Sequence, residues 1–217
     1  MTINQPVYIN ILEDCARFNA TLVAVSKIQP NSKILELYQL GHRDFGENYV
    51  QELLEKQQAL PPDIRWHFIG HLQTNKAKYI VPFVHLIHGV DSLKLLKEIN
   101  KQAAKANRKV QCLLQVYIAS EETKFGLDYT EAEDILQQKN QFENVSIVGL
   151  MGMASNTSHE MIVKNEFEQL AAFFKQHFDP QVHHLSMGMS SDYLLALTSG
   201  SNMVRIGSSI FGFRVYQ

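Results

Sequence analysis

Eight short apolar runs, rich in β-branched and aromatic residues, recur along this 217-residue chain and are separated by polar segments with helical spacing. The runs span residues 22–25, 44–45, 66–69, 83–87, 110–116, 146–150, 184–186 and 203–206. Between them, apolar residues stand three or four apart, as in Leu93, Leu96 and Ile99. Strand and helix are therefore predicted to alternate along the whole chain.

The alternation favours an α/β fold with a parallel sheet, because a parallel connection needs a crossover long enough to hold a helix. Eight such units indicate a closed (β/α)8 barrel, the TIM-barrel architecture, with an open doubly wound sheet as the alternative. Residues 6–18 have helical spacing and predict an extra helix before the first strand. No long run of Gly, Pro and Ser interrupts the chain, so we expect a single domain over residues 1–217.

Charge and composition limit the classes of partner. The formal net charge is −2 with acids and bases interspersed, which gives no electrostatic reason to expect nucleic acid or a membrane surface, and favours a small molecule. The start lacks a signal-peptide pattern and no apolar run approaches the ~20 residues of a membrane helix, so a cytoplasmic location is expected. Two separated cysteines predict buried thiols rather than a disulfide framework.

Lys27 is the first candidate for chemistry. In such barrels the reactive residues follow the carboxyl ends of the strands, and Lys27 follows the first apolar run. Desolvation at the barrel mouth would lower the pKa of its amine, which an imine-forming lysine requires. By position alone, a lysine that extends to solvent is the competing interpretation.

Two glycine-containing turns near the end of the chain add support. Residues 186–192 (SMGMSSD) combine hydroxyls, a glycine and a helix start, and residues 205–209 (RIGSS) form a second turn of this kind. The last two strand ends of a barrel often bind phosphate, through free backbone amides and the positive end of a helix. Each turn taken separately also fits an ordinary strand-to-helix connection. Together with Lys27 they predict a site for a phosphorylated carbonyl compound.

Other motifs are weaker. His67 and His71 are four residues apart but flank a predicted strand end, so helical metal-ligand geometry is not expected. His85 and His88, and likewise His183 and His184, lack the spacing of a metal site. No G-x-G-x-x-G motif follows the first strand, and neither a Walker-type loop nor a G-x-S-x-G elbow is present.

Seven stretches in order carry a resemblance to a known family. They are residues 23–27 (VAVSK), 45–52 (FGENYVQE), 66–76 (WHFIGHLQTNK), 124–126 (KFG), 149–151 (GLM), 185–190 (LSMGMS), and 204–207 (VRIG) followed by 210–212 (IFG). With these motifs the chain closely resembles the pyridoxal 5′-phosphate (PLP) homeostasis family, the proline synthetase-associated proteins. The resemblance covers nearly the whole chain and implies the barrel of the alanine racemase N-terminal domain, without the second, β-rich domain of the racemase.

The resemblance also implies a set of PLP-binding residues. Lys27 would hold PLP as a Schiff base, and Arg205 would face the pyridine nitrogen. The other implied neighbours of the cofactor are Asn48 and His71 around the ring, Ser186, Gly207 and Ser208 at the phosphate, and Met187 and Ser190 in the phosphate loop.

The implied role is that of a carrier and regulator of PLP in vitamin B6 homeostasis rather than of an enzyme. A guanidinium cannot accept the pyridinium proton, so Arg205 would keep the ring nitrogen unprotonated. The cofactor would then be a poor electron sink. Racemisation needs acid/base groups on both faces of the substrate carbon, and one of these comes from the racemase's second domain. The alternatives are a low-activity amino-acid racemase and, without PLP, a phosphosugar lyase or isomerase with Lys27 as the Schiff-base residue.

Further expectations concern partners and two single residues. A reversible imine at an open barrel mouth would suit PLP transfer to apo-enzymes, and the family resemblance favours a monomer. Lys124 could be a secondary PLP acceptor, with a solvated surface lysine as the competing interpretation. Tyr117 stands where the family usually has Asn, which alters any cofactor contact made from that position.

Overall fold

Each of the eight apolar runs contributes a strand in the computed structural model, which describes residues 2–121 and 125–212. The strands are β1 (Thr21–Val25), β2 (Asp44–Glu47), β3 (Arg65–Phe68), β4 (Leu86–Val90), β5 (Val110–Val116), β6 (Val145–Gly152), β7 (His184–Ser186) and β8 (Met203–Ile206). They pair in parallel and in chain order, and β8 pairs back onto β1, which closes the barrel. The predicted (β/α)8 barrel is confirmed, and the open sheet is excluded.

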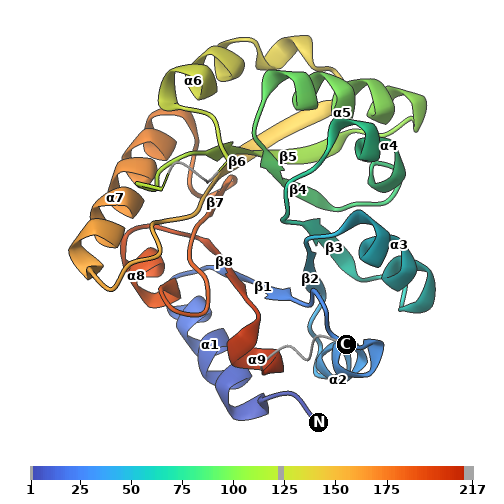
Figure 1. The fold of residues 1–217 in the computed structure, drawn as a ribbon, viewed down its shortest axis with the longest axis vertical. Coiled ribbons are helices and arrows are strands. Elements are labelled where there is room, and N and C mark those ends of the chain that lie inside the picture. Colours follow the sequence, from blue (N-terminus) through green and yellow to red (C-terminus); the bar gives the residue numbers. More distant parts are fainter. Residues whose placement is uncertain (1, 122–124, 213–217) are drawn as a thin grey trace.

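Helices surround the strands as an outer ring (Figure 1). They are α1 (Gln5–Arg17), α2 (Asn31–Gln39), α3 (Val50–Ala59), α4 (Ala77–Ile80), α5 (Leu93–Lys105), α6 (Tyr129–Gln137), α7 (Glu160–His177), α8 (Tyr193–Thr198) and α9 (Ser208–Phe211), with 3-10 turns η1 (Thr74–Lys76) and η2 (Lys139–Gln141). Local signals set some of their starts: Asp128 and Glu131 form a capping box at α6. Within the described ranges, no helix has both the length and the apolar character needed to cross a membrane.

One predicted strand was misplaced. The sequence pattern predicts a strand over residues 83–87, whereas β4 is Leu86–Val90. The Val84 N–H donates to the Ile80 carbonyl (2.9 Å), so the turn after α4 takes up the first apolar residues of this run. The extra N-terminal helix is confirmed as α1, shifted by one residue.

Side chains alternate between the two faces of the barrel wall, as the strand period of two requires. A small cluster fills the barrel interior and consists of Val23, Leu86, Leu113, Met151 and Met203. Their strand neighbours, such as Ala24 and Val204, belong to the larger core between the strands and the helices. By the same alternation, Arg205 and Lys27 belong to the interior series of β8 and of the extension of β1.

Gly149 marks a close approach of β6 and β7. It has a φ of +149°, and a Cβ added there would lie 1.8 Å from the carbonyl oxygen of His184. Gly149→Ala should lower the free energy of unfolding by roughly 2 kcal/mol or more, because the strands must separate and the backbone is strained. Gly41→Ala is the matched control, since its φ is +93° but nothing lies within 4 Å. Urea unfolding of both variants measures the difference, and equal losses would contradict the close approach.

Candidate functional site

The predicted cofactor residues come from strand ends at one face of the barrel. Lys27 lies two residues beyond β1, Asn48 directly follows β2, and Gly207 directly follows β8. The neighbouring strands β1 and β8 are in register at Val23 and Arg205. Lys27 and Arg205 therefore rise from adjacent strands toward the carboxyl end of the barrel.

The backbone beside Lys27 is strained. Ile28 has a φ of +59°, a left-handed conformation that is rare for a β-branched residue and costs on the order of 1–3 kcal/mol. Its N–H donates to Glu52 Oε1 at 2.6 Å, which holds the turn in this shape. Lys27 is half-buried. Strain of this kind persists only where the surroundings enforce it, and here it fixes the direction in which the chain leaves β1.

A buried ionic cluster between the barrel wall and α3 supports this turn. The Lys56 ammonium donates to the Ser26 carbonyl (2.7 Å), to Glu47 Oε1 (2.8 Å) and to Glu52 Oε1 (2.6 Å). The Ser26 hydroxyl also donates to Glu47 Oε1 (2.6 Å). The Lys56 ammonium thus connects three parts of the chain, which are the end of β2, the start of α3 and the turn that carries Lys27.

The pKa of Glu47 follows from this burial. Burial raises the pKa of Glu47 to about 7, against the opposing effects of Lys56 and Ser26. In the unfolded chain the carboxyl has its ordinary pKa of 4.5. Between pH 4.5 and about 7, Glu47 therefore keeps its proton in the folded protein, whereas the unfolded chain has released it.

This proton predicts a pH dependence of stability. The contribution of Glu47 to the free energy of unfolding is largest below pH 4.5. It falls by about 3 kcal/mol at most as the pH rises to about 7. Glu47→Gln cannot titrate, so its stability relative to the parent protein should improve across this window. Urea unfolding of PLP-free protein at pH 5, 6, 7 and 8 measures the trend. The exposed Glu133→Gln is the control, and a parallel pH profile for Glu47→Gln would refute the prediction.

Arg205 is a buried cation inside the barrel. Its Nη1 donates to the Ser186 carbonyl (2.8 Å) and to Ser186 Oγ (2.7 Å), and its Nη2 donates to the Gly152 carbonyl (3.1 Å). Burial lowers the pKa of Arg205 to about 10, against the attraction of Asp192. The guanidinium therefore stays charged at neutral pH, and three acceptors from β6 and β7 fix its plane.

A line of polar side chains continues from Arg205 through the barrel interior. Ser186 Oγ lies 3.1 Å from His88 Nδ1, and His88 Nε2 lies 2.9 Å from His67 Nδ1. His67 Nε2 lies 3.0 Å from Asp44 Oδ1. We name Asp44, His67, His88, Ser186 and Arg205 the interior relay. Burial lowers the pKa of His88 well below its usual value, so this imidazole is neutral.

Asn48 and His71 border the barrel mouth on the side of β2 and β3. Asn48 Oδ1 is buried and has no hydrogen-bond partner among the described residues. Gly70 permits this position, because a Cβ on Gly70 would lie 2.3 Å from the Asn48 carbonyl oxygen. His71 Nδ1 lies 2.8 Å from Asp91 Oδ2, and its ring stacks on Phe125 with centroids 4.5 Å apart. A buried acceptor without a donor suits a ligand that brings a hydroxyl.

The two predicted phosphate turns lie side by side. The Gly207 N–H approaches Ser190 Oγ at 3.4 Å, and a Cβ on Gly207 would make a tight contact of 3.0 Å with the Val25 carbonyl oxygen. Ser208 is exposed at the first position of α9, where backbone N–H groups lack partners within the helix. Asp192 precedes α8, but its carboxylate accepts from the Met189 N–H (2.6 Å) instead of capping the helix.

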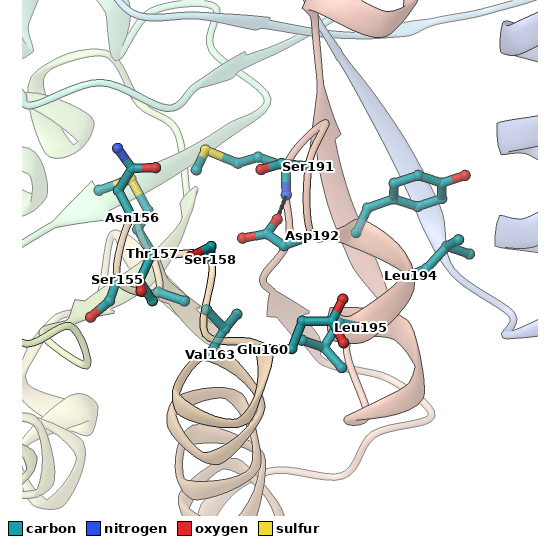
Figure 2. A pocket seen from close by; sticks show the side chains of 14 residues that line it. Ser155, Asn156, Thr157, Ser158, Glu160, Val163, Ser191, Asp192, Leu194 and Leu195 are labelled. Carbon is teal, nitrogen blue, oxygen red and sulfur yellow. Dashed lines mark hydrogen bonds between the residues drawn. The ribbon is translucent and has the colours of Figure 1, made fainter.

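A hollow of about 530 Å³ adjoins these turns (Figure 2). The loop after β6, with Asn156 and Thr157, faces Ser191 and Asp192 of the loop after β7 across the hollow. The start of α7 also lines the hollow. Residues after two neighbouring strands thus enclose space at the carboxyl face, next to Ser190.

The sequence singles out four further residues. Ser186 Oγ is fully buried and engaged by Arg205 and His88, which places it in the interior relay. The Met187 side chain packs in the core between strands and helices, so it does not reach the barrel mouth. Lys124 lies outside the described residues. Tyr117 is half-buried, and its backbone N–H donates to the Leu127 carbonyl (2.8 Å).

Sequence reasoning missed the buried partners of the site. Lys56 could have been noticed because it lies three residues after the buried Leu53, on the apolar face of α3. His88 is a polar residue within an otherwise apolar strand, which is also a signal. Their partners, however, come from other strands, and no local spacing indicates them.

Comparison with known proteins identifies the class of this barrel. The family model of the alanine racemase N-terminal domain matches residues 9–215, and the chain belongs to that family. A relative from Aquifex aeolicus named pyridoxal phosphate homeostasis protein is 38% identical over 94% of this chain and 90% of its own length. The chain is therefore a member of the pyridoxal phosphate homeostasis protein family, as the sequence motifs indicate.

Solved structures agree with this assignment. PipY of Synechococcus elongatus PCC7942, determined without PLP, is 38% identical with a TM-score of 0.83, over 89% of this chain and 93% of PipY. The structure of PipY with PLP bound is 37% identical with a TM-score of 0.80, over the same shares of both chains.

Proposed function

We propose that this protein binds PLP as a Schiff base on Lys27 and serves PLP homeostasis. The observation that carries the proposal is the position of the half-buried Lys27, two residues beyond β1, the strand that pairs with β8 and its buried cation Arg205. PipY, to which this chain is similar, has a solved structure with PLP bound. Bound PLP supplies a reactive aldehyde and an aromatic ring able to accept electrons. Asn48 Oδ1, which has no partner among the residues that the structure describes, fits such a ligand, because PLP carries a ring hydroxyl that can donate to it.

The chain's own residues divide the binding among them. Lys27 provides the amine, and the Ile28–Glu52 bond sets the direction of its backbone. Arg205 presents a fixed guanidinium from β8, where the ring nitrogen would be expected. The phosphate is offered hydroxyls and backbone amides by Ser190, Gly207 and Ser208. Ser186 acts indirectly, because its hydroxyl accepts a hydrogen bond from Arg205. Met187 contributes only its backbone, since its side chain packs in the core.

We further propose that the protein carries PLP without catalysis and supplies it to PLP-dependent apo-enzymes. In this proposal residues 1–217 form one PLP-binding domain, and the protein is a cytoplasmic monomer. Racemase activity is the alternative, and the His71–Asp91 pair favours it, since it is an imidazole–carboxylate pair at the barrel mouth. A carrier needs no acid or base opposite Lys27, whereas a racemase does. Contacts of PLP with Tyr117 or Lys124 stay predictions.

One experiment separates the two roles. PLP-loaded protein is incubated with an apo-enzyme, and recovery of that enzyme's activity is followed beside the loss of optical activity of D- and L-amino acids. Transfer of PLP without racemisation supports the carrier role. Catalytic racemisation that disappears in both Lys27→Ala and His71→Gln would establish the enzyme instead.

A further inference from the structure

Three side chains with metal-ligating atoms meet toward the amino ends of the strands, away from Lys27. Asp44 begins β2, His67 is the third residue of β3, and His85 directly precedes β4. One ligating atom from each lies within 4.8 Å of those of the other two. We name these three residues the floor cluster.

We propose that the floor cluster binds a divalent transition-metal ion, with Zn²⁺ as the preferred occupant. Two imidazoles and one carboxylate are ligands that zinc accepts in three-residue sites with a fourth, open position. His67 Nε2 and Asp44 Oδ1 are 3.0 Å apart, close to the ~3.3 Å between ligand atoms of a tetrahedral site with bonds of about 2.0 Å. Only a small separation of these atoms is needed to admit the ion.

The surroundings allow entry and offer a fourth ligand. His85 is exposed, so the ion can reach the floor cluster from solvent. His184 begins β7 within electrostatic range of His67 and Asp44, and water completes the coordination. Arg65 donates to Asp44 Oδ1 (2.7 Å) and competes as a cation. Its side chain is 49% exposed, so it can turn toward solvent.

Metal binding would reverse the direction of the hydrogen bonds along the interior relay. Without metal, the Asp44 carboxylate only accepts, so His67 donates from Nε2 and, in the tautomer with this single ring proton, accepts at Nδ1. His88 then donates from Nε2 to His67 and accepts the Ser186 hydroxyl at Nδ1. A metal on His67 Nε2 moves the His67 proton to Nδ1 and the His88 proton to Nδ1. One proton moves within each ring, so the number of protons is unchanged.

This reversal links the floor cluster to the opposite end of the barrel. His88 would become a donor to Ser186 Oγ, which already accepts from Arg205. The Ser186 hydroxyl proton must then turn to another acceptor. None of the three metal ligands is itself a residue proposed to hold the cofactor, so zinc binding can be tested in the absence of PLP.

The test is a calorimetric titration of untagged, PLP-free protein with ZnCl₂. We expect one Zn²⁺ per chain, and an affinity reduced roughly 100-fold or more in His85→Gln, because a direct ligand counts at least as much as a supporting contact. His159→Gln, an exposed histidine outside the cluster, should bind as the parent does. Circular dichroism checks that each variant is folded.

Saturable one-to-one binding lost only in His85→Gln supports the site. The absence of saturable binding, equal affinity in His85→Gln, or a matching loss in His159→Gln would overturn it. Ring ¹⁵N NMR of the unsubstituted protein gives a second readout. Zinc should move the His88 proton from Nε2 to Nδ1, and an unchanged His88 spectrum would overturn the reversal of the relay.

Discussion

Lys27→Ala should lose the visible imine absorption that the parent protein shows after incubation with PLP and removal of excess ligand. The alanine side chain has no amine to form the C=N bond, while the barrel and the other proposed contacts remain. PLP retained by the variant should fall to what non-covalent contacts alone can hold. Absorption spectra and fluorimetric assay of released PLP, both at matched protein concentration, measure this loss.

The control for this variant is Lys109→Ala. Lys109 is exposed and directly precedes β5, at the end of the barrel opposite the mouth. Its spectrum should match that of the parent protein. Parent-level imine absorption in Lys27→Ala would disprove the assignment of the amine, and an equal loss in both variants would indicate unspecific lysine modification.

Arg205→Met should lower the free energy of unfolding by about 3–5 kcal/mol, because it removes three hydrogen bonds from a charged donor. Each buried acceptor left unpaired costs about 1–3 kcal/mol. The substitution leaves the carbonyls of Ser186 and Gly152 and the Ser186 hydroxyl without their donor. A loss of this size is a large share of the ~5–15 kcal/mol that stabilises an ordinary domain. Urea unfolding followed by the fluorescence of Trp66, the single tryptophan, measures it.

Arg17→Met is the matched control for Arg205→Met. The Arg17 guanidinium lies at the surface, with a side chain 69% exposed, and bonds only to Asp14 in the described contacts. Its loss should change stability by no more than about 0.5 kcal/mol. Similar unfolding midpoints for the two variants would mean that the buried hydrogen bonds of Arg205 contribute little.

The fold was largely predictable, because the signals for it are local. Each strand is a run of apolar residues whose two faces are both covered, and helical spacing separates the runs. The prediction failed at β4, where Phe83 and Val84 are as apolar as the residues of a strand. There a local backbone hydrogen bond from Val84 back to Ile80 in α4 keeps Val84 in the turn, and the apolar run itself does not indicate this bond.

The site was predictable only in its outline. Lys27, Asn48, Arg205 and Gly207 could be placed because each stands at or near a strand end. The Lys56 cluster could not be predicted, since it joins β1, β2 and α3 through contacts separated by up to 30 residues. The interior relay depends likewise on which strands face one another inside the closed barrel.

Reduction with borohydride followed by peptide mapping tests the central claim most directly. Borohydride converts a C=N bond between PLP and a lysine into a stable secondary amine, which survives proteolysis and is located by mass spectrometry. We predict that the pyridoxyl phosphate group will be found on the peptide containing Lys27, at close to one per chain. Modification spread over surface lysines, or a Lys27 peptide that stays unmodified after incubation with PLP, would contradict it.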